Sequence, residues 1–282
     1  MTNIMITGIS GNVGSSVAKH FEENKMEYIV GVRNPKKIKA NNFSQIRYLD
    51  FENPESYNDA LRGIDTIFLV RPPQLTDIVG IFLPFIKACK SEGVCHIVFL
   101  SLLGVEKNPF PPHHKIEKLI ESSGIDYTFI RPSFFMQNLI NPHAEDIRLR
   151  NEIYIPSGKA KISFIDTEDI GEIIAITMLD NKHRNKKYTV TGPESITYYD
   201  VAKQMSHILE REISYTNPSL LKFRKEIIRR GTKKEFANVM TILYLTTKFG
   251  LANHLTDTVE EILGRKPNTI KTFTLNNKEI WK

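Results

Sequence analysis

Cysteine is scarce in this sequence, and its scarcity excludes two kinds of architecture. Only Cys89 and Cys95 occur among the 282 residues. Two cysteines give neither a disulfide framework nor the spacing of metal ligands. Both lie among apolar residues, so we expect two buried free thiols and no metal site.

Long apolar segments and a strong charge imbalance are absent as well. No apolar run is long enough to cross a bilayer, and the first residues lack the basic stretch and apolar core of a secretory signal. The formal net charge of +6 favours anionic ligands slightly but does not indicate nucleic acid. We therefore expect a soluble cytoplasmic protein without a membrane partner, for which nucleic acid is a disfavoured partner.

The beginning of the chain has the pattern of a strand, a glycine-rich turn and a helix. Residues 4–6 form a short apolar run, which is typical of a strand buried on both faces of a parallel sheet. Gly8, Gly11 and Gly14 follow, and a helical pattern begins after Gly14. Glycines in such a turn let the backbone approach a pyrophosphate at a helix N-terminus. The pattern predicts dinucleotide binding; the alternative is a tight turn that merely needs glycine.

Basic residues follow the second predicted strand, residues 28–32. In this class of fold, an acidic residue near the end of that strand binds the ribose 2′-hydroxyl of NAD. Here Arg33 occupies the place, with Lys36, Lys37 and Lys39 close behind. A guanidinium can bind a 2′-phosphate through two hydrogen bonds. The sequence therefore favours NADP(H) over NAD(H), unless these residues form only a solvated basic loop.

Strand and helix patterns alternate regularly through residue 132, which predicts an α/β fold with a Rossmann-type doubly wound parallel sheet. We expect the strand order 3-2-1-4-5-6. The further strands are expected at residues 46–51, 64–70, 95–101 and 127–132, and the helices at 54–61, 78–89 and 115–122.

Ligands of such a sheet lie beyond the carboxyl ends of its strands. Asp50 is expected there, where an adenine could dock, and Arg131 projects from the same edge. The residues expected to bind the cofactor are Thr7, Gly8, Ser10, Gly11, Asn12, Val13, Gly14, Arg33, Asp50, Val70, Arg71, Ser101 and His113.

The second half of the chain is less regular. A strand and turn are expected at residues 153–163, a strand at 188–191, and helices at 167–179, 199–210, 220–230, 234–249 and 256–263. We expect residues 1–132 with about 164–192 to form the nucleotide-binding core. Residues 133–163 and 193–282 are then expected to form a smaller, mainly helical substrate lobe that closes over the cofactor edge.

Several segments together resemble the NmrA-like branch of the atypical short-chain dehydrogenases/reductases. They are residues 7–14, Arg33, Asp50, and residues 122–132, 135–139, 164–170 and 264–267. The resemblance covers nearly the whole chain. It implies NADPH-dependent quinone and dye reductases, isoflavone-type reductases or non-catalytic NADP(H)-sensing regulators as relatives, with sugar-nucleotide epimerases more distant.

The chain departs from that superfamily at the catalytic pair. The superfamily uses Tyr-x-x-x-Lys, and these positions fall near Pro109 and His113. Proline cannot donate a proton, whereas His113 can bind a ribose or relay a proton; the alternative is that His113 and His114 only begin a helix. Ser101 stands where the superfamily has a catalytic serine; the alternative is that it only forms a hydrogen bond to the loop. His113 and Ser101 are the candidate catalytic residues.

Two further features of the sequence, an aromatic segment after residue 132 and a basic run, each have two alternative roles. Phe134, Phe135 and Asn138 are expected to line a flat apolar substrate pocket, or else to belong to the core of the lobe. The basic run at residues 224–230 is either a solvated helix face or a docking surface for an acidic partner or nucleic acid.

Without the tyrosine, hydride transfer from NADPH to a conjugated acceptor such as a quinone is favoured over reduction of a simple ketone. A redox sensor that binds NADP(H) and a protein partner is the alternative. An epimerase ranks third, because its chemistry needs the missing tyrosine.

Overall fold

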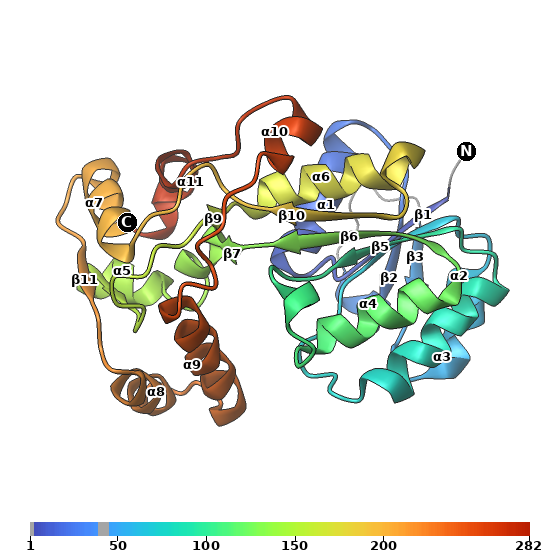
Figure 1. The fold of residues 1–282 in the computed structure, drawn as a ribbon, viewed down its shortest axis with the longest axis horizontal. Helices are drawn as coiled ribbons and strands as arrows, with labels where there is room; N and C mark the ends of the chain where they lie inside the picture. Colours follow the sequence, from blue (N-terminus) through green and yellow to red (C-terminus); the bar gives the residue numbers. More distant parts are fainter. Residues whose placement is uncertain (1–2, 39–44) are drawn as a thin grey trace. The chain divides into compact units, whose positions relative to one another are not determined.

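The computed structural model describes residues 3–38 and 45–282. The chain forms two compact units, of which the first comprises residues 1–132, 167–190 and 261–264. The second comprises residues 133–166, 191–260 and 265–282. The chain thus leaves the first unit after residue 132 and returns to it at residue 167 (Figure 1). Lys39, from the predicted basic loop, lies outside the described residues.

A seven-stranded parallel sheet forms the centre of the first unit (Figure 1). Its order is β10-β6-β5-β4-β1-β2-β3, so the predicted order 3-2-1-4-5-6 is confirmed and β10 is added beyond β6. The strands are β1 (Ile4–Thr7), β2 (Ile29–Val32), β3 (Gln45–Tyr48), β4 (Thr66–Leu69), β5 (His96–Leu100), β6 (Asp126–Pro132) and β10 (Lys186–Val190).

Helices cover both faces of this sheet, as expected for a Rossmann-type α/β fold. α1 (Asn12–Glu23) and α6 (Thr167–Leu179) lie on one face, and α2 (Tyr57–Leu61), α3 (Ile78–Ser91) and α4 (Pro112–Ser123) lie on the other (Figure 1). Short 3₁₀ helices occur at Pro35–Lys37, Pro54–Ser56, Val105–Lys107 and Asn181–His183. A large apolar core includes Met5, Ile67, Phe82, Phe99 and Ile116, because strands covered on both faces are apolar throughout.

Several local predictions differ from the structure, and three of the differences have a clear physical reason. α1 begins at Asn12 rather than after Gly14, because Gly11 caps the helix and accepts the first helical hydrogen bond from Ser15 N (2.9 Å). The helix predicted at residues 54–61 is divided into a 3₁₀ turn and α2. Cys89 is buried as expected, but Cys95 is exposed because it precedes β5 in the turn after α3.

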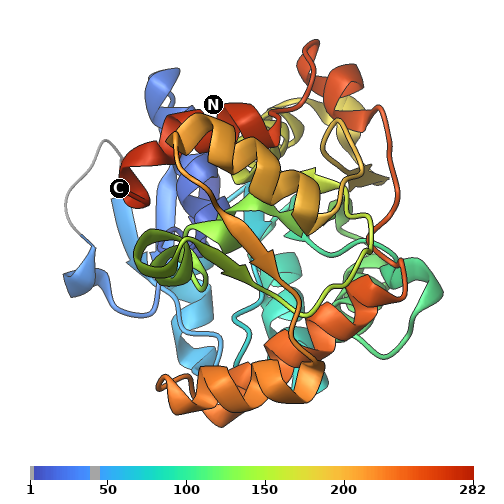
Figure 2. The same cartoon turned by 90° about the vertical axis from the view of Figure 1, so that its left-hand side faces the viewer.

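The second unit is built from short strands and helices around an aromatic core. β7 (Phe134–Phe135) pairs with β9 (Phe164–Ile165), and β8 (Glu152–Tyr154) pairs with β11 (Ser214–Thr216), both in parallel. β11 is the orange strand in Figure 2. Its helices are α5 (Ala144–Arg150), α7 (Tyr198–Leu209), α8 (Leu220–Arg229), α9 (Lys234–Lys248) and α11 (Ile270–Asn277), with 3₁₀ turns at Met136–Leu139 and Lys278–Ile280. α10 (Thr258–Leu263) spans the boundary between the units at residue 261.

Candidate functional site

The turn between β1 and α1 is fixed by close packing against the neighbouring strand β4. Gly8 has φ +67°, and a Cβ atom there would lie 3.1 Å from the Val70 Cβ. The Thr7 hydroxyl donates a hydrogen bond to Phe68 O (2.8 Å) and accepts one from Val70 N (3.1 Å). Both contacts hold the end of β1 against β4, so Thr7 shapes the turn from within the sheet.

Gly14 allows α1 to pack directly onto this turn. A Cβ atom on Gly14 would lie 2.2 Å from Gly8 O, well inside van der Waals contact. Gly11 N–H donates to Gly8 O (2.9 Å) and closes the turn, while Val13 is buried beneath it and Asn12 begins the helix. The N-terminus of α1, with its unpaired N–H groups and partial positive charge, therefore lies at the carboxyl edge of the sheet.

A pocket of about 570 Å³ opens at this edge. Four segments that follow β1, β2, β3 and β4 line it, namely residues 7–11, 31–34 with 37–38, 49–52 and 70–75. The structure thus brings together eight of the thirteen residues predicted to bind the cofactor, Thr7, Gly8, Ser10, Gly11, Arg33, Asp50, Val70 and Arg71. Asn12, Val13 and Gly14 are in the adjoining first turn of α1.

Cations and carboxylates meet in the part of the pocket after β2 and β3. The Arg33 guanidinium is largely exposed and lies 3.9 Å from a Glu52 carboxylate oxygen. Asp50 accepts a hydrogen bond from Glu52 N (3.0 Å), so its carboxylate closes its own turn. Lys37 also lines the pocket, whereas Lys36 does not. Glu52 is not among the residues predicted from the sequence, where its only signal is its place two residues after Asp50.

Arg71 carries a partly buried positive charge in the wall of the same pocket. Its Nη1 donates to the carbonyl oxygens of Pro72 (3.1 Å), Pro73 (3.1 Å) and Leu75 (3.0 Å). Its Nε is buried and has no hydrogen-bond partner among the described residues. Burial lowers the pKa of this guanidinium from its ordinary value. An anionic group in the pocket would compensate this charge.

Ser101 lies outside the pocket lining, in a buried network of charged side chains. Its hydroxyl donates to Glu117 Oε1 (2.6 Å). Arg131 donates to the same carboxylate through Nε (3.0 Å) and Nη2 (2.6 Å), and its Nη1 lies 3.3 Å from Glu106 Oε2. These contacts tie the end of β5 to α4 and β6. A catalytic role for Ser101 stays a prediction, and Glu117 is the partner that the sequence did not reveal.

His113 lies in the first turn of α4, with its ring 5.9 Å from that of Phe99. Burial, and then the positive charge of Arg71, lower the pKa of His113 to about 3. Its Nδ1 is buried without a hydrogen-bond partner in the described part of the chain. The imidazole is therefore neutral near pH 7. The neighbouring His114 donates from Nδ1 to Val105 O (2.9 Å) and holds the preceding loop.

The residues predicted to line an acceptor pocket belong to the second unit. Phe134 is buried in its aromatic core, with its ring 6.0 Å from Phe164 and 5.9 Å from Tyr244. Phe135 and Asn138 are half-buried. Packing in this core accounts for the burial of Phe134. Contact with an acceptor remains a prediction for Phe134, Phe135 and Asn138.

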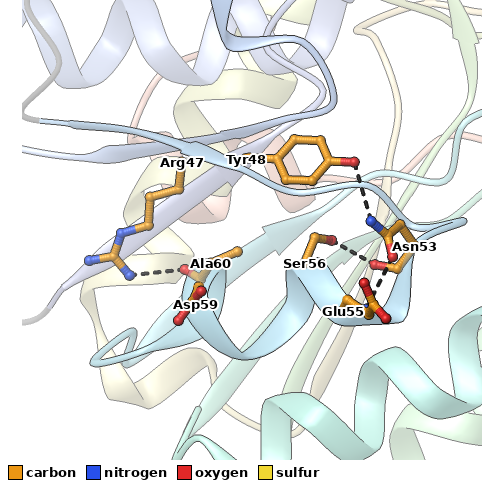
Figure 3. Close-up of a pocket in the computed structure, with 7 residues that line it drawn as sticks. All are labelled: Arg47, Tyr48, Asn53, Glu55, Ser56, Asp59 and Ala60. Atoms are coloured by element: carbon orange, nitrogen blue, oxygen red, sulfur yellow. Dashed lines mark hydrogen bonds between the residues drawn. The ribbon is translucent and has the colours of Figure 1, made fainter.

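A second hollow, of about 410 Å³, lies beside the edge strand β3 (Figure 3). Several of its polar groups already bond to one another. Arg47 donates to Ala60 O (2.9 Å), and Ser56 donates to Asn53 O (2.7 Å). The carboxylates of Glu55 and Asp59 line the same hollow, so it does not suit a phosphate-bearing ligand. Residues 3–38 and 45–282 contain no cluster of His, Cys, Asp and Glu that could hold a metal ion.

Comparison with known proteins gives one family across nearly the whole chain. The sequence profile of the NmrA-like family matches residues 1–274. The chain is 30% identical to NAD(P)H azoreductase of Xenophilus azovorans over 278 residues, which cover 96% of each protein. It is 28% identical to prestalk A differentiation protein A of Dictyostelium discoideum, over 96% of this chain and 91% of that protein.

The fold is shared with a solved reductase. The crystal structure of the NADPH-dependent quinone oxidoreductase QOR2 of Escherichia coli, complexed with NADPH, has a TM-score of 0.86 and 22% identity. The match covers 98% of this chain and 99% of that chain.

Proposed function

We propose, since this chain belongs to the NmrA-like family, that it is an NADP(H)-dependent reductase of small, flat, conjugated acceptors such as quinones. The observation that carries the proposal is the pocket at the carboxyl edge of the sheet. It joins the glycine turn and the N-terminus of α1 to Arg33, Lys37 and Arg71.

Each part of the pocket suits one part of the cofactor. The α1 N-terminus, with Ser10 and Gly11, would hold the pyrophosphate, because its unpaired N–H groups and partial positive charge suit an anion. Arg33 would bind the 2′-phosphate, and Asp50 would lie near the adenine. When bound, the reduced nicotinamide supplies the hydride.

The chain's own residues suit an acceptor that needs little acid catalysis. A ketone develops charge on one oxygen and benefits strongly from a positioned proton donor. Pro109 cannot be that donor, and His113 is neutral near pH 7, so it can donate a hydrogen bond but is a weak acid. A quinone spreads the added electrons over its ring, and positioning alone can provide much of the rate.

Replacing Arg33 by alanine is expected to weaken NADPH binding by about 10- to 150-fold, because a charge-assisted pair contributes about 1.5–3 kcal/mol. Binding of NADH, which lacks the 2′-phosphate, should change little. Isothermal titration calorimetry measures both affinities. The matched control is Lys36→Ala, which removes the same charge from the same loop but not from the pocket lining. Unchanged NADPH affinity in Arg33→Ala would show that this residue does not select the cofactor.

Sustained NADPH oxidation is expected with quinones in a panel that also contains azo dyes, triphenylmethane dyes and enones.

His113→Ala should lower kcat/KM about five- to tenfold, because one hydrogen bond contributes about 1 kcal/mol. Phe135→Ala should raise KM if its ring contacts the acceptor. Because the pKa of His113 is about 3, its titration should leave no inflection in kcat between pH 5 and 8.

A regulator that senses NADP(H) is the second candidate, favoured by the replacement of the catalytic pair by Pro109 and His113. It predicts tight NADPH binding without turnover on any acceptor of the panel. It also predicts a protein partner that is captured in only one cofactor state.

A further inference from the structure

Exposed apolar side chains gather on one part of the second unit. Nine of the seventeen large apolar side chains exposed on the described residues lie within residues 221–255. Many of them are on α9, which packs beside α8 (Figure 1). Arg224 on α8 donates to Asn238 on α9 (2.7 Å), so the two helices form one surface, here called the α8–α9 hairpin.

The helical repeat places the exposed apolar residues of α9 on its outer side. Phe236, Val239 and Leu243 are three and four residues apart and share one face, and Ile242 adjoins them with 61% of its surface exposed. The opposite face is buried in the core of the unit, through Ala237, Met240, Tyr244 and Thr247. Residues 236–247 contain no charged side chain, so the centre of the outer face is apolar.

Positive charge surrounds this apolar face. Residues 219–251 contain eight Lys and Arg and two Asp and Glu, a net charge of +6 that equals the formal net charge of the whole chain. One of the two acids, Glu226, is already paired with Arg229 (2.7 Å) and Arg230 (2.6 Å). The exposed lysines lie on α8 and at both ends of α9, namely Lys222, Lys225, Lys233, Lys234 and Lys248.

We propose that the α8–α9 hairpin docks this protein onto an anionic phospholipid surface. An interfacial helix inserts phenylalanine and aliphatic side chains between headgroups, while lysines extend to the phosphates at its edges. The apolar surface continues beyond α9 to Phe249, which is 75% exposed, and to Leu251.

The charge and apolar pattern disfavours other occupants. A second copy would bring two faces of the same positive charge together, and nucleic acid would find aliphatic side chains where it needs stacking and phosphate contacts. No helix of the described residues could cross a membrane. The sequence-based expectation of no membrane partner rested on the lack of a membrane-spanning segment. Docking onto the surface of a membrane does not require such a segment. The proposal is independent of the proposed reductase function.

Flotation of the full chain with lipid vesicles tests the proposal. The chain should bind vesicles of 70% phosphatidylcholine and 30% phosphatidylglycerol, but not pure phosphatidylcholine, and binding should weaken with added salt. Ile242→Gln with Phe249→Gln should reduce binding at least tenfold. Lys233→Glu with Lys234→Glu should reduce it by a similar factor. Circular dichroism checks that each variant is folded.

Leu149→Gln is the matched control, because Leu149 is 63% exposed on α5, outside the hairpin. Normal vesicle binding by this variant supports the proposal. Three results overturn it: no binding to anionic vesicles, equal loss in Leu149→Gln, or a dimer in sedimentation that Ile242→Gln with Phe249→Gln dissociates. Capture of an acidic protein by the wild-type hairpin, with no vesicle binding, also overturns it.

Discussion

Replacing Glu117 by alanine is expected to lower the free energy of unfolding by about 3–5 kcal/mol. Glu117 is buried and accepts hydrogen bonds from Arg131 and Ser101. Its removal leaves a buried guanidinium whose Nη1 lies 3.3 Å from the half-exposed carboxylate of Glu106. An unpaired buried charge costs far more than the intact pair contributes. Urea unfolding, followed by circular dichroism, measures the loss.

Two variants separate this charge effect from a general loss of packing. Glu117→Leu combined with Arg131→Met should recover most of the lost stability, because neither charge then remains buried. Asp59→Ala breaks the exposed pair with Arg62 (2.8 Å) and should change stability by less than about 1 kcal/mol. A loss below about 1 kcal/mol in Glu117→Ala would contradict the importance of the buried pair.

Acidification from pH 7 to 4.5 is expected to lower the free energy of unfolding by about 5 kcal/mol through His96 and His143 alone, and His113, whose pKa is also about 3, adds to this loss. Burial, and then Arg184, lower the pKa of His96 to about 4; burial, and then Arg230, lower that of His143 to about 3. Both are near 6.5 in an unfolded chain. The stability that they contribute is fully present above pH 6.5 and is lost as the pH falls toward 4 and 3. Each then costs about 1.4 kcal/mol per pH unit.

The two histidines lie in different units. The loss of stability on acidification can therefore be assigned to each of them by separate variants. His96 donates from Nε2 to the Thr128 hydroxyl (2.8 Å), since Thr128 itself donates to His183 O. His143 Nε2 lies 2.5 Å from the Tyr244 hydroxyl. His96→Asn and His143→Gln keep an N–H donor without a titrating group. Each should reduce the slope of stability against pH by about 1.4 kcal/mol per unit.

The measurement is urea unfolding at several pH values. Circular dichroism follows the whole chain, and the fluorescence of the buried Trp281 follows the second unit, which contains His143. His254→Gln, at an exposed position, is the control and should leave the slope unchanged. A free energy of unfolding that stays constant from pH 7 to 4.5 would contradict the prediction.

The sheet of the first unit could be predicted from the sequence because buried parallel strands are short apolar runs with regular spacing. The pocket followed from the same pattern, since carboxyl ends of parallel strands meet at one edge. Cys95 was predicted wrongly, because an apolar neighbourhood in sequence does not reveal that a residue stands in a turn. The start of α1 was missed because the sequence alone does not distinguish a glycine that precedes a helix, such as Gly11, from a glycine inside the first turn, such as Gly14.

The second unit was harder to predict. Strands of two or three residues, such as β7 and β9, are too short for an alternating pattern. The seven-residue α5 and the polar α11 were missed for a related reason, since neither has an extended apolar face. The partners of Ser101 could not be predicted either, because Glu117 reaches it only through the docking of α4 onto the sheet.

The packing of α6 on α1 has a consequence for folding during synthesis. A Cβ atom on Gly171 of α6 would lie 2.6 Å from the backbone of Ser16, so the two helices touch nearly backbone to backbone. α6 and β10 are translated only after residues 133–166 of the other unit. At about 5–20 residues per second, the ribosome needs roughly 3–12 seconds to extend the chain from residue 132 to 190. For that interval the nascent nucleotide-binding unit has one helix layer incomplete, which makes it a natural client for chaperones that cover apolar surface.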